Sequence, residues 1–224
     1  MPDRRPRKPP YTIDVVLLTA VRGQLAVLLS RSPDGREKWT LPWEASRNGE
    51  ALDAAASRIS KATLGEDTVW KEQIGAFGDG KRHPSDADIS VAFASLVPTG
   101  TASPVGGVHA WFPLADVPAL SPRQRLILDS AVSMIRTRMD QSPVAFRLLP
   151  QMFTLTELQQ MYELLLAKRL HKASFRRALQ GAWLVEPTDE WRSEGRGRPA
   201  QLYRYAPRKR RPAQRGIRLD LLSS

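Results

Sequence analysis

The residues of this chain that could do chemistry gather in one stretch, Leu41–Gly65. It carries three carboxylates, Glu44, Glu50 and Asp53, and grouped carboxylates could hold the Mg²⁺ that activates water in hydrolytic enzymes. From Ala54 to the end of the stretch there is no carboxylate. A helix formed by this second half would therefore present no acidic face to a hard cation.

Other catalytic arrangements are missing as well. The chain has no Cys, which excludes a disulfide framework, a thiolate metal site and a Cys nucleophile. The histidines His83, His109 and His171 are scattered, and no pair has the spacing of metal ligands. There is no G-x-S-x-G motif. The sequence predicts no catalytic residue, no bound metal and no cofactor.

The same stretch resembles the Nudix box of pyrophosphate hydrolases, G-x5-E-x7-R-E-U-x-E-E-x-G-U. Glu50, Arg58 and Gly65 match the first Glu, the Arg and the last Gly of that box. In this register the opening Gly becomes Glu44. The three acids that hold magnesium in the family are replaced here by Ile59, Ala62 and Thr63. The resemblance implies a Nudix scaffold without its metal chemistry.

Two other interpretations of the stretch stay open. Glu44, Glu50 and Asp53 could form an atypical magnesium site of a Nudix-type hydrolase, although they lie ahead of the usual metal-binding face. Alternatively, Ala51–Thr63 could be an Ala-rich surface helix of a different α/β domain.

Charge is distributed unevenly along the 224 residues, whose formal net charge is +11. Residues 141–224 hold 16 of the 34 Lys and Arg residues but only 7 of the 23 Asp and Glu residues. A part this basic indicates a polyanionic partner. No apolar run reaches the roughly 18 residues of a membrane-spanning helix, and the basic, Pro-rich N-terminus is unlike a signal peptide. We expect a cytoplasmic protein that does not bind membranes.

Apolar runs and proline positions predict how the chain is organised. Two apolar runs, Tyr11–Val21 and Gln24–Ser30, precede the box, and a short segment, Val69–Ile74, and a further run, Ile89–Val97, follow it. Ser121-Pro122 has the pattern of a helix start. We expect basic tails at 1–10 and 208–224, an N-terminal domain at 11–120, a connecting helix at 121–142 and a C-terminal domain at 143–207.

The C-terminal domain contains the pattern of a helix-turn-helix. Thr154-x-x-Glu157 predicts a capping box at the start of a helix over Leu155–Lys168. A shorter helix, His171–Ala182, follows after a tight turn. Its apolar residues fall on one side, and the opposite side carries Ala173, Arg176, Arg177 and Gln180, with Lys172 and Ser174 beside its N-terminal end. A second helix with a basic outer face is typical of a DNA-binding helix-turn-helix.

A wing is predicted after the second helix. Trp183–Glu186 and Gln201–Tyr205 have the composition of two short paired strands. The loop between them contains Arg196 and Arg198, and arginines on a flexible loop suit a narrow minor groove. Taken alone, the loop could equally be a solvated basic hairpin.

The chain resembles the Nudix-related transcriptional regulators, which fuse a Nudix-like effector domain to a winged helix-turn-helix. The resemblance rests on Pro143–Glu163, Ala173–Leu179 and Arg198–Tyr205, with Phe77–Pro84 in the first domain. It implies an α+β fold, with an N-terminal Nudix-like α/β/α sandwich and a C-terminal winged helix-turn-helix. It also implies a homodimeric repressor that binds double-stranded operator DNA.

Individual residues take their expected roles from this resemblance. The Phe-Arg-Arg helix of the family is its recognition helix, which makes Arg176 and Arg177 expected DNA contacts beside Lys172. Ser174 stands where the family usually has Asn, so any base contact made by that Asn is in doubt.

The resemblance also implies a small-molecule effector, which is ADP-ribose or a related compound for many members and a sugar such as arabinose for others. The positions expected to form pocket walls are Arg31, Trp39, Phe77 and Arg82. Trp43 and Glu44, in place of the usual glycine pair, would disfavour a diphosphate. A further alternative is a scaffold that binds a partner protein through a non-catalytic Nudix domain and nucleic acid through its basic half.

Overall fold

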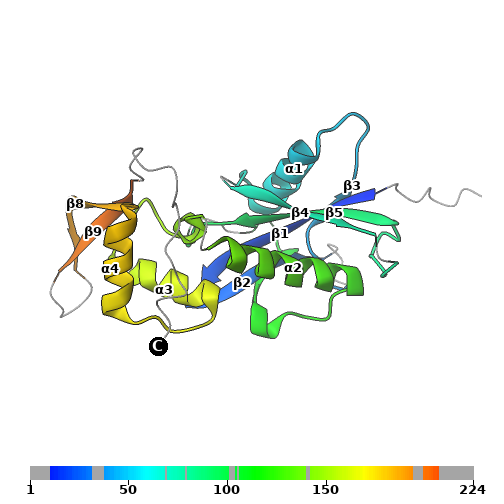
Figure 1. Cartoon of the computed structure of the whole chain (residues 1–224). Coiled ribbons are helices and arrows are strands. Elements are labelled where there is room, and N and C mark those ends of the chain that lie inside the picture. Colours follow the sequence, from blue (N-terminus) through cyan, green and yellow to red (C-terminus); the bar gives the residue numbers. More distant parts are fainter. Residues whose placement is uncertain are drawn as a thin grey trace, which may run out of the picture. The chain divides into compact units, whose positions relative to one another are not determined.

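The computed structural model describes residues 11–31, 38–68, 70–78, 80–100, 104, 106–139, 142–193 and 199–206. The chain forms two compact units, Met1–Ser133 and Met134–Ser224. Each unit combines helices with strands (Figure 1). The α+β fold class predicted from the sequence is confirmed.

The first unit is built on a six-stranded sheet in the order β4-β5-β1-β2-β6, with β3 paired to β1 outside this order. β1 is parallel to β5 and antiparallel to β2 and β3. The central position of β1 explains why its residues are almost all buried. The strands are β1 (Tyr11–Val21), β2 (Gln24–Ser30), β3 (Trp43–Ala45), β4 (Lys71–Phe77), β5 (Ile89–Leu96) and β6 (His109–Pro113).

The two apolar runs that precede the box in sequence form β1 and β2. Their connection is the two-residue turn Arg22-Gly23, with φ angles of 49° and 75°. Two successive positive φ values are typical of a type I′ turn, whose twist matches that of an antiparallel hairpin. This turn sets the pairing of Val21 with Gln24.

α1 (Leu52–Leu64) packs on one face of the sheet. Ala56 and Ile59 of α1 belong to one buried apolar cluster with Ile13 and Val15 of β1. The helix predicted over the second half of the Nudix-like stretch therefore exists. Its buried face contributes to the core of the first unit.

α2 (Pro122–Arg138) follows the short 3-10 helix η1 (Leu114–Asp116). Successive residues of a strand point to opposite faces, and Asp14 of β1 points away from α1 towards the first turn of α2. There the Gln124 side chain donates to the Asp14 carboxylate at 3.0 Å. Ser121 precedes the helix, and its hydroxyl accepts from the Gln124 N–H at 3.5 Å. Helices thus lie on both faces of the sheet, as in an α/β/α sandwich.

The described part of the second unit contains the α-helices α3 and α4, a short 3-10 helix and a three-stranded sheet in the order β7-β9-β8. Phe175 of the second helix and Tyr162 of the first are both fully buried, with ring centroids 5.3 Å apart. The elements are η2 (Val144–Leu148), β7 (Met152–Phe153), α3 (Leu155–Leu166), α4 (Lys172–Ala182), β8 (Val185–Arg192) and β9 (Ala200–Tyr205).

The capping box predicted at the start of α3 is confirmed. The Glu157 N–H donates to the Thr154 hydroxyl at 3.1 Å, and the Thr154 N–H donates to the Glu157 carboxylate at 2.6 Å. The tight turn to α4 is held by Glu163, whose carboxylate accepts from the Leu170 N–H at 2.9 Å.

Some predicted boundaries are wrong. α3 ends at Leu166 because Ala167 turns into the left-handed region, with φ of 54°. The first wing strand, β8, begins at Val185 and not at Trp183, because Trp183 is the left-handed residue that ends α4. β8 also extends further than predicted, to Arg192. No helix among the described residues is long and apolar enough to cross a bilayer.

Candidate functional site

A cavity of about 1200 Å³ opens in the first unit. It is lined by the end of β2, the segment from Lys38 to Glu44, one face of α1, the loop from Arg82 to Asp86, the start of β6 and the approach to α2. The lining combines indole rings with cationic and hydroxyl side chains. Such a mixture of flat apolar surfaces and a few polar groups is typical of a small-molecule pocket.

Three of the four residues predicted to form pocket walls line this cavity: Arg31, Trp39 and Arg82. The Arg31 guanidinium lies over the Trp39 ring, 4.8 Å from its centroid. Trp39 is fixed by an edge contact with Phe112 on β6, with ring centroids 4.9 Å apart. Arg82 lies at the exposed rim, with 83% of its side chain accessible. The structure thus places a positive charge and a flat apolar face side by side in the cavity.

Phe77, the fourth predicted residue, is not among the residues that line this cavity. It is the last residue of β4 and pairs with Ser90 of β5. β4 thus extends past Ile74, where the short segment noted in the sequence ends, and makes Phe77 part of the sheet.

Ile59, Ala62 and Thr63, which the Nudix-like spacing aligns with the three metal-holding acids, all line the cavity. Ile59 and Thr63 are 2% and 3% exposed, and the Thr63 hydroxyl donates to the Ile59 carbonyl at 2.8 Å. This hydroxyl is therefore already used within the helix. Across the described parts of the chain, no group of three His, Cys, Asp or Glu side chains could hold a metal ion.

Glu44 and Glu50, two acids of the alternative metal site, are both bound to Arg58. The guanidinium donates from Nε and Nη2 to the two carboxylate oxygens of Glu50, each at 2.8 Å, and from Nη1 to Glu44. The hydrogen bond from Arg58 lowers the pKa of Glu50, and the hydrogen bond to Glu50 raises the pKa of Arg58. These contacts join the loop that follows β3 to α1.

His109, on β6, also lines the cavity. Its Nδ1 lies 2.7 Å from the Ser30 hydroxyl. Burial lowers the pKa of this imidazole below its ordinary value of 6.5, so the ring is neutral near pH 7. It adds a polar group to the cavity without adding a charge.

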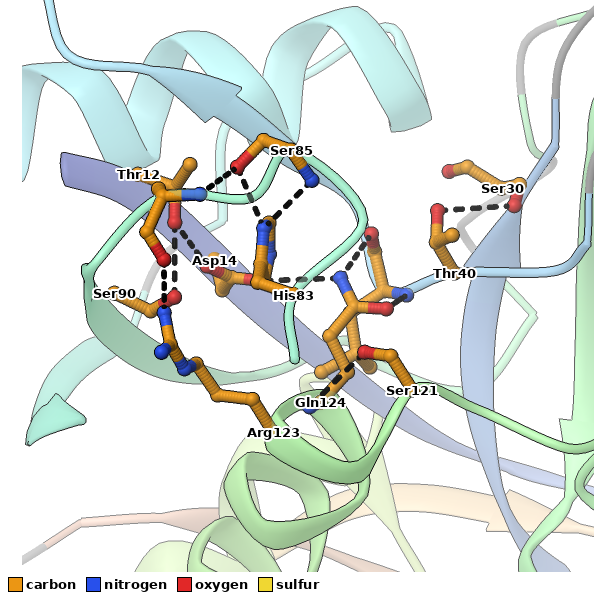
Figure 2. Close-up of polar contacts among 12 residues, drawn as sticks. Thr12, Asp14, Ser30, Thr40, His83, Ser85, Ser90, Ser121, Arg123 and Gln124 are labelled. Atoms are coloured by element: carbon orange, nitrogen blue, oxygen red, sulfur yellow. Dashed lines mark hydrogen bonds and ion pairs between the residues drawn. The ribbon is translucent and has the colours of Figure 1, made fainter. Parts of the chain in front are cut away.

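Sequence reasoning missed a buried polar network beneath the cavity (Figure 2). His83, expected to be one of three scattered histidines, is 1% exposed, and its Nε2 lies 3.0 Å from the Asp14 carboxylate. The Ser85 N–H donates to His83 Nδ1 at 3.1 Å, which leaves Nε2 to carry the hydrogen donated to Asp14. Gln124 donates to the same carboxylate oxygen.

Two signals in the sequence could have indicated this network. Asp14 interrupts an apolar run, Tyr11–Val21, where a carboxylate needs buried partners. Gln124 lies three and four residues before Ile127 and Leu128, on the buried stripe of α2.

The second unit presents a basic surface along α4. Lys172, Arg176, Arg177 and Gln180 are exposed, whereas Phe175 and Leu179 are buried. The predicted division of this helix into an inner apolar side and an outer basic side is confirmed. Ser174 is half-buried, and its hydroxyl lies 3.2 Å from Nδ1 of His171.

β8 and β9 form the hairpin predicted as a wing. Arg192 near the end of β8 donates to Glu157 at 2.7 Å, which ties the hairpin to the start of α3. Arg196 and Arg198, the predicted wing-tip contacts, lie outside the described residues.

Comparison with known proteins agrees with the description of the first unit and with that of the second. The family model of the NrtR DNA-binding winged helix domain matches residues 145–205. The ADPR responsive transcriptional repressor NtrR of Acinetobacter baylyi is 30% identical over 208 residues, covering 88% of this chain and 82% of the relative.

Solved structures give the same result. The crystal structure of Shewanella oneidensis NrtR complexed with a 27mer DNA is similar with a TM-score of 0.76 and 29% identity, covering 88% of this chain and 94% of that chain. A MutT/nudix family protein from Enterococcus faecalis shares the fold, with a TM-score of 0.68, 20% identity and coverage of 90% of this chain and 88% of that chain. The chain therefore belongs to the NrtR-like family of ligand-sensing, DNA-binding transcriptional regulators, in which a Nudix domain is fused to a winged helix domain.

Proposed function

We propose that this regulator is a repressor that binds its operator with α4 as the recognition helix. The observation that carries the proposal is the exposed row of Lys172, Arg176, Arg177 and Gln180 on a helix whose opposite side is buried. A helix of this kind fits the major groove, where Arg donates to the guanine edge and Lys or Arg neutralises phosphates. Ser174 lies beside the row, and Arg196 and Arg198 would reach the adjacent minor groove.

We further propose that the protein acts in the cytoplasm as a homodimer. The relative from Acinetobacter baylyi is described as a transcriptional repressor, and dimeric helix-turn-helix proteins read two half-sites related by symmetry. The operator is then an inverted repeat with half-sites about one helical turn apart.

The cavity of the first unit is the effector site, and ADP-ribose is the first compound to test because the Acinetobacter relative is described as ADPR responsive. Arg31 offers a cation for phosphate, and Trp39 offers a face for a base or sugar. The negative charge of Glu44 would by itself disfavour a diphosphate. That carboxylate is paired with Arg58 and Arg47, so its charge is largely offset.

The Nudix domain binds its ligand without hydrolysing it. The Nudix-like register places the lost acids at Ile59, Ala62 and Thr63, and all three line the cavity. An isoleucine, an alanine and an engaged hydroxyl are poor ligands for Mg²⁺, which requires several oxygen ligands at near-octahedral geometry.

The test begins with selection of bound duplexes from a random DNA pool by the purified protein. Fluorescence anisotropy then compares the selected duplex with a scrambled one, and ADP-ribose is titrated into the complex. We expect a preference of about a thousandfold or more for the selected duplex and release by the ligand. Equal affinity for both duplexes would favour the nucleic-acid-binding scaffold. Magnesium-dependent turnover of ADP-ribose or a dinucleotide would favour a hydrolase.

A further inference from the structure

The first turn of α2 is bound to both sides of the effector cavity. One side is the segment from Trp39 to Trp43, and the other is the loop from Arg82 to Asp86. Both segments make hydrogen bonds to Arg123 or Gln124, the second and third residues of α2. The network in Figure 2 therefore joins residues that line the cavity to the first turn of α2.

Gln124 holds the first side. Its Oε1 accepts from the Leu41 N–H at 3.2 Å, and its Nε2 donates to the Leu41 carbonyl at 3.4 Å. Nε2 also donates to Asp14 at 3.0 Å. The side chain is fully buried, so a lost hydrogen bond could not be replaced by water. A shift of Leu41 must then be accompanied by a shift of Gln124.

The second side is held through Arg123 and His83. The Arg123 N–H donates to the Arg82 carbonyl at 3.3 Å, and its Nη1 donates to the Ala87 carbonyl at 2.6 Å. His83 shares the Asp14 carboxylate oxygen with Gln124. Its ring also meets Trp43 edge to face, with centroids 5.0 Å apart. The hydrogen bonds from both sides of the cavity thus end at the Asp14 carboxylate or at the first turn of α2.

α2 continues without interruption from this turn to Arg138, and the boundary between the two compact units falls inside it, after Ser133. Near its C-terminal end, Arg136 Nε donates to the Leu165 carbonyl of α3 at 3.0 Å. A helix transmits a displacement of its first turn along its axis because its backbone hydrogen bonds make it stiff.

We infer that Gln124 is the positioning residue that couples occupancy of the cavity to the DNA-binding unit through α2. Gln124 contacts the pocket wall and not the DNA. This inference rests on the proposed function, since it assumes that the protein binds both an effector and an operator.

The variant that tests it is Gln124→Met, which keeps the length of the side chain and removes its hydrogen bonds. Arg125→Ala is the matched control, because Arg125 is the next residue, is exposed and pairs with Asp129 on the same helix at 3.1 Å. The measured quantity is the ratio of operator Kd values with and without saturating ADP-ribose. We expect a ratio of at least about fivefold in the wild type and in Arg125→Ala.

In Gln124→Met we expect a ratio near one, with the separate affinities for ADP-ribose and for the operator within a few-fold of wild type. A merely structural role would lower both affinities together and leave the ratio unchanged. An unchanged ratio in a variant that binds both ligands would overturn the inference.

A second measurement needs neither a variant nor an effector. Coupling is reciprocal, so operator DNA must alter the cavity if the cavity alters operator binding. Amide hydrogen exchange of residues 39–43 is measured in the wild type with and without the selected duplex, and we expect the exchange rates to change. If the selected duplex binds but the exchange rates of residues 39–43 do not change, the coupling is overturned and the proposed function stands. Failure to bind any duplex specifically would overturn the proposed function, and this inference with it.

Discussion

Arg58 and Glu50 form a bidentate ion pair, with two parallel hydrogen bonds of 2.8 Å between the guanidinium and the carboxylate. Both side chains are largely covered, with 20% and 18% of their surfaces accessible. The pair matches the Arg and the first Glu of the Nudix-like spacing. These two residues have a structural task, which is to hold the loop against α1.

Glu50→Gln is expected to show how this pair depends on pH. Because Arg58 lowers the folded-state pKa of Glu50 below 4.5, the pair stabilises the fold fully above that value. Its contribution is lost as the pH falls through the lowered pKa. The melting temperature of the variant should therefore lie furthest below that of the wild type near pH 7, and the two should converge in acid.

Glu66→Gln is the control for this series, since Glu66 is an exposed glutamate just after α1. Its melting temperature should follow the wild type at every pH. If the gap between Glu50→Gln and the wild type stayed constant down to pH 3, the ion pair would not be the cause of the difference.

Arg176→Ala and Arg177→Ala are each expected to weaken operator binding. A lost base contact should reduce the binding free energy by about 1–3 kcal/mol and relax sequence preference at one position. A lost phosphate contact should weaken binding to all duplexes alike and lower the salt dependence. Anisotropy titrations at several salt concentrations distinguish the two.

Arg125→Ala again serves as the control, because it removes a cation from the first unit and leaves α4 unchanged. Wild-type operator affinity in the double variant of Arg176 and Arg177 would show that α4 is not the recognition helix.

Trp39→Ala is expected to weaken ADP-ribose binding while operator binding without ligand stays unchanged. Loss of the ring removes the surface over which Arg31 lies, and such a contact contributes about 0.5–2 kcal/mol, or up to roughly thirtyfold in Kd. Isothermal titration calorimetry measures the change, and Trp39→Phe should recover part of it. Full affinity in Trp39→Ala would place the ligand elsewhere.

Restoring the acids tests the register of the Nudix-like stretch. A variant with Glu in place of Ile59, Ala62 and Thr63 should melt at a lower temperature than the wild type, because carboxylates replace the buried side chains of Ile59 and Thr63. Added Mg²⁺ should recover part of this loss, whereas the wild type should not respond. Lys61→Glu, an exposed position on the same helix, is the control. If Mg²⁺ left the triple variant unchanged, the register would be wrong.

Local signals explain why much of the fold could be predicted. The apolar runs that form β1 and β2, the capping box of Thr154 and Glu157 and the two-sided pattern of α4 each depend on neighbouring residues. The end of α4 at Ala182 was predicted, but the start of β8 at Val185 was not, because the left-handed conformation of Trp183 is unusual for a bulky residue.

The buried network was beyond prediction for a different reason. His83 and Gln124 meet Asp14 across 69 and 110 residues of sequence, and no local pattern relates them. For the same reason, Arg31, Trp39 and Arg82 could be proposed as pocket walls only from a family resemblance. Phe77, proposed on the same basis, belongs to β4 and does not line the cavity.

Asp14 also has a consequence for how the sheet assembles. Its neighbour Ile13 points into the apolar cluster against α1, whereas Asp14 points to the opposite face, where it accepts from Gln124. A slip of β1 by one residue would exchange the two and place a carboxylate among aliphatic side chains. Asp14 therefore disfavours this mispaired arrangement of β1. Its replacement would affect both the pairing of the strands and the hydrogen bonds that join the cavity to α2.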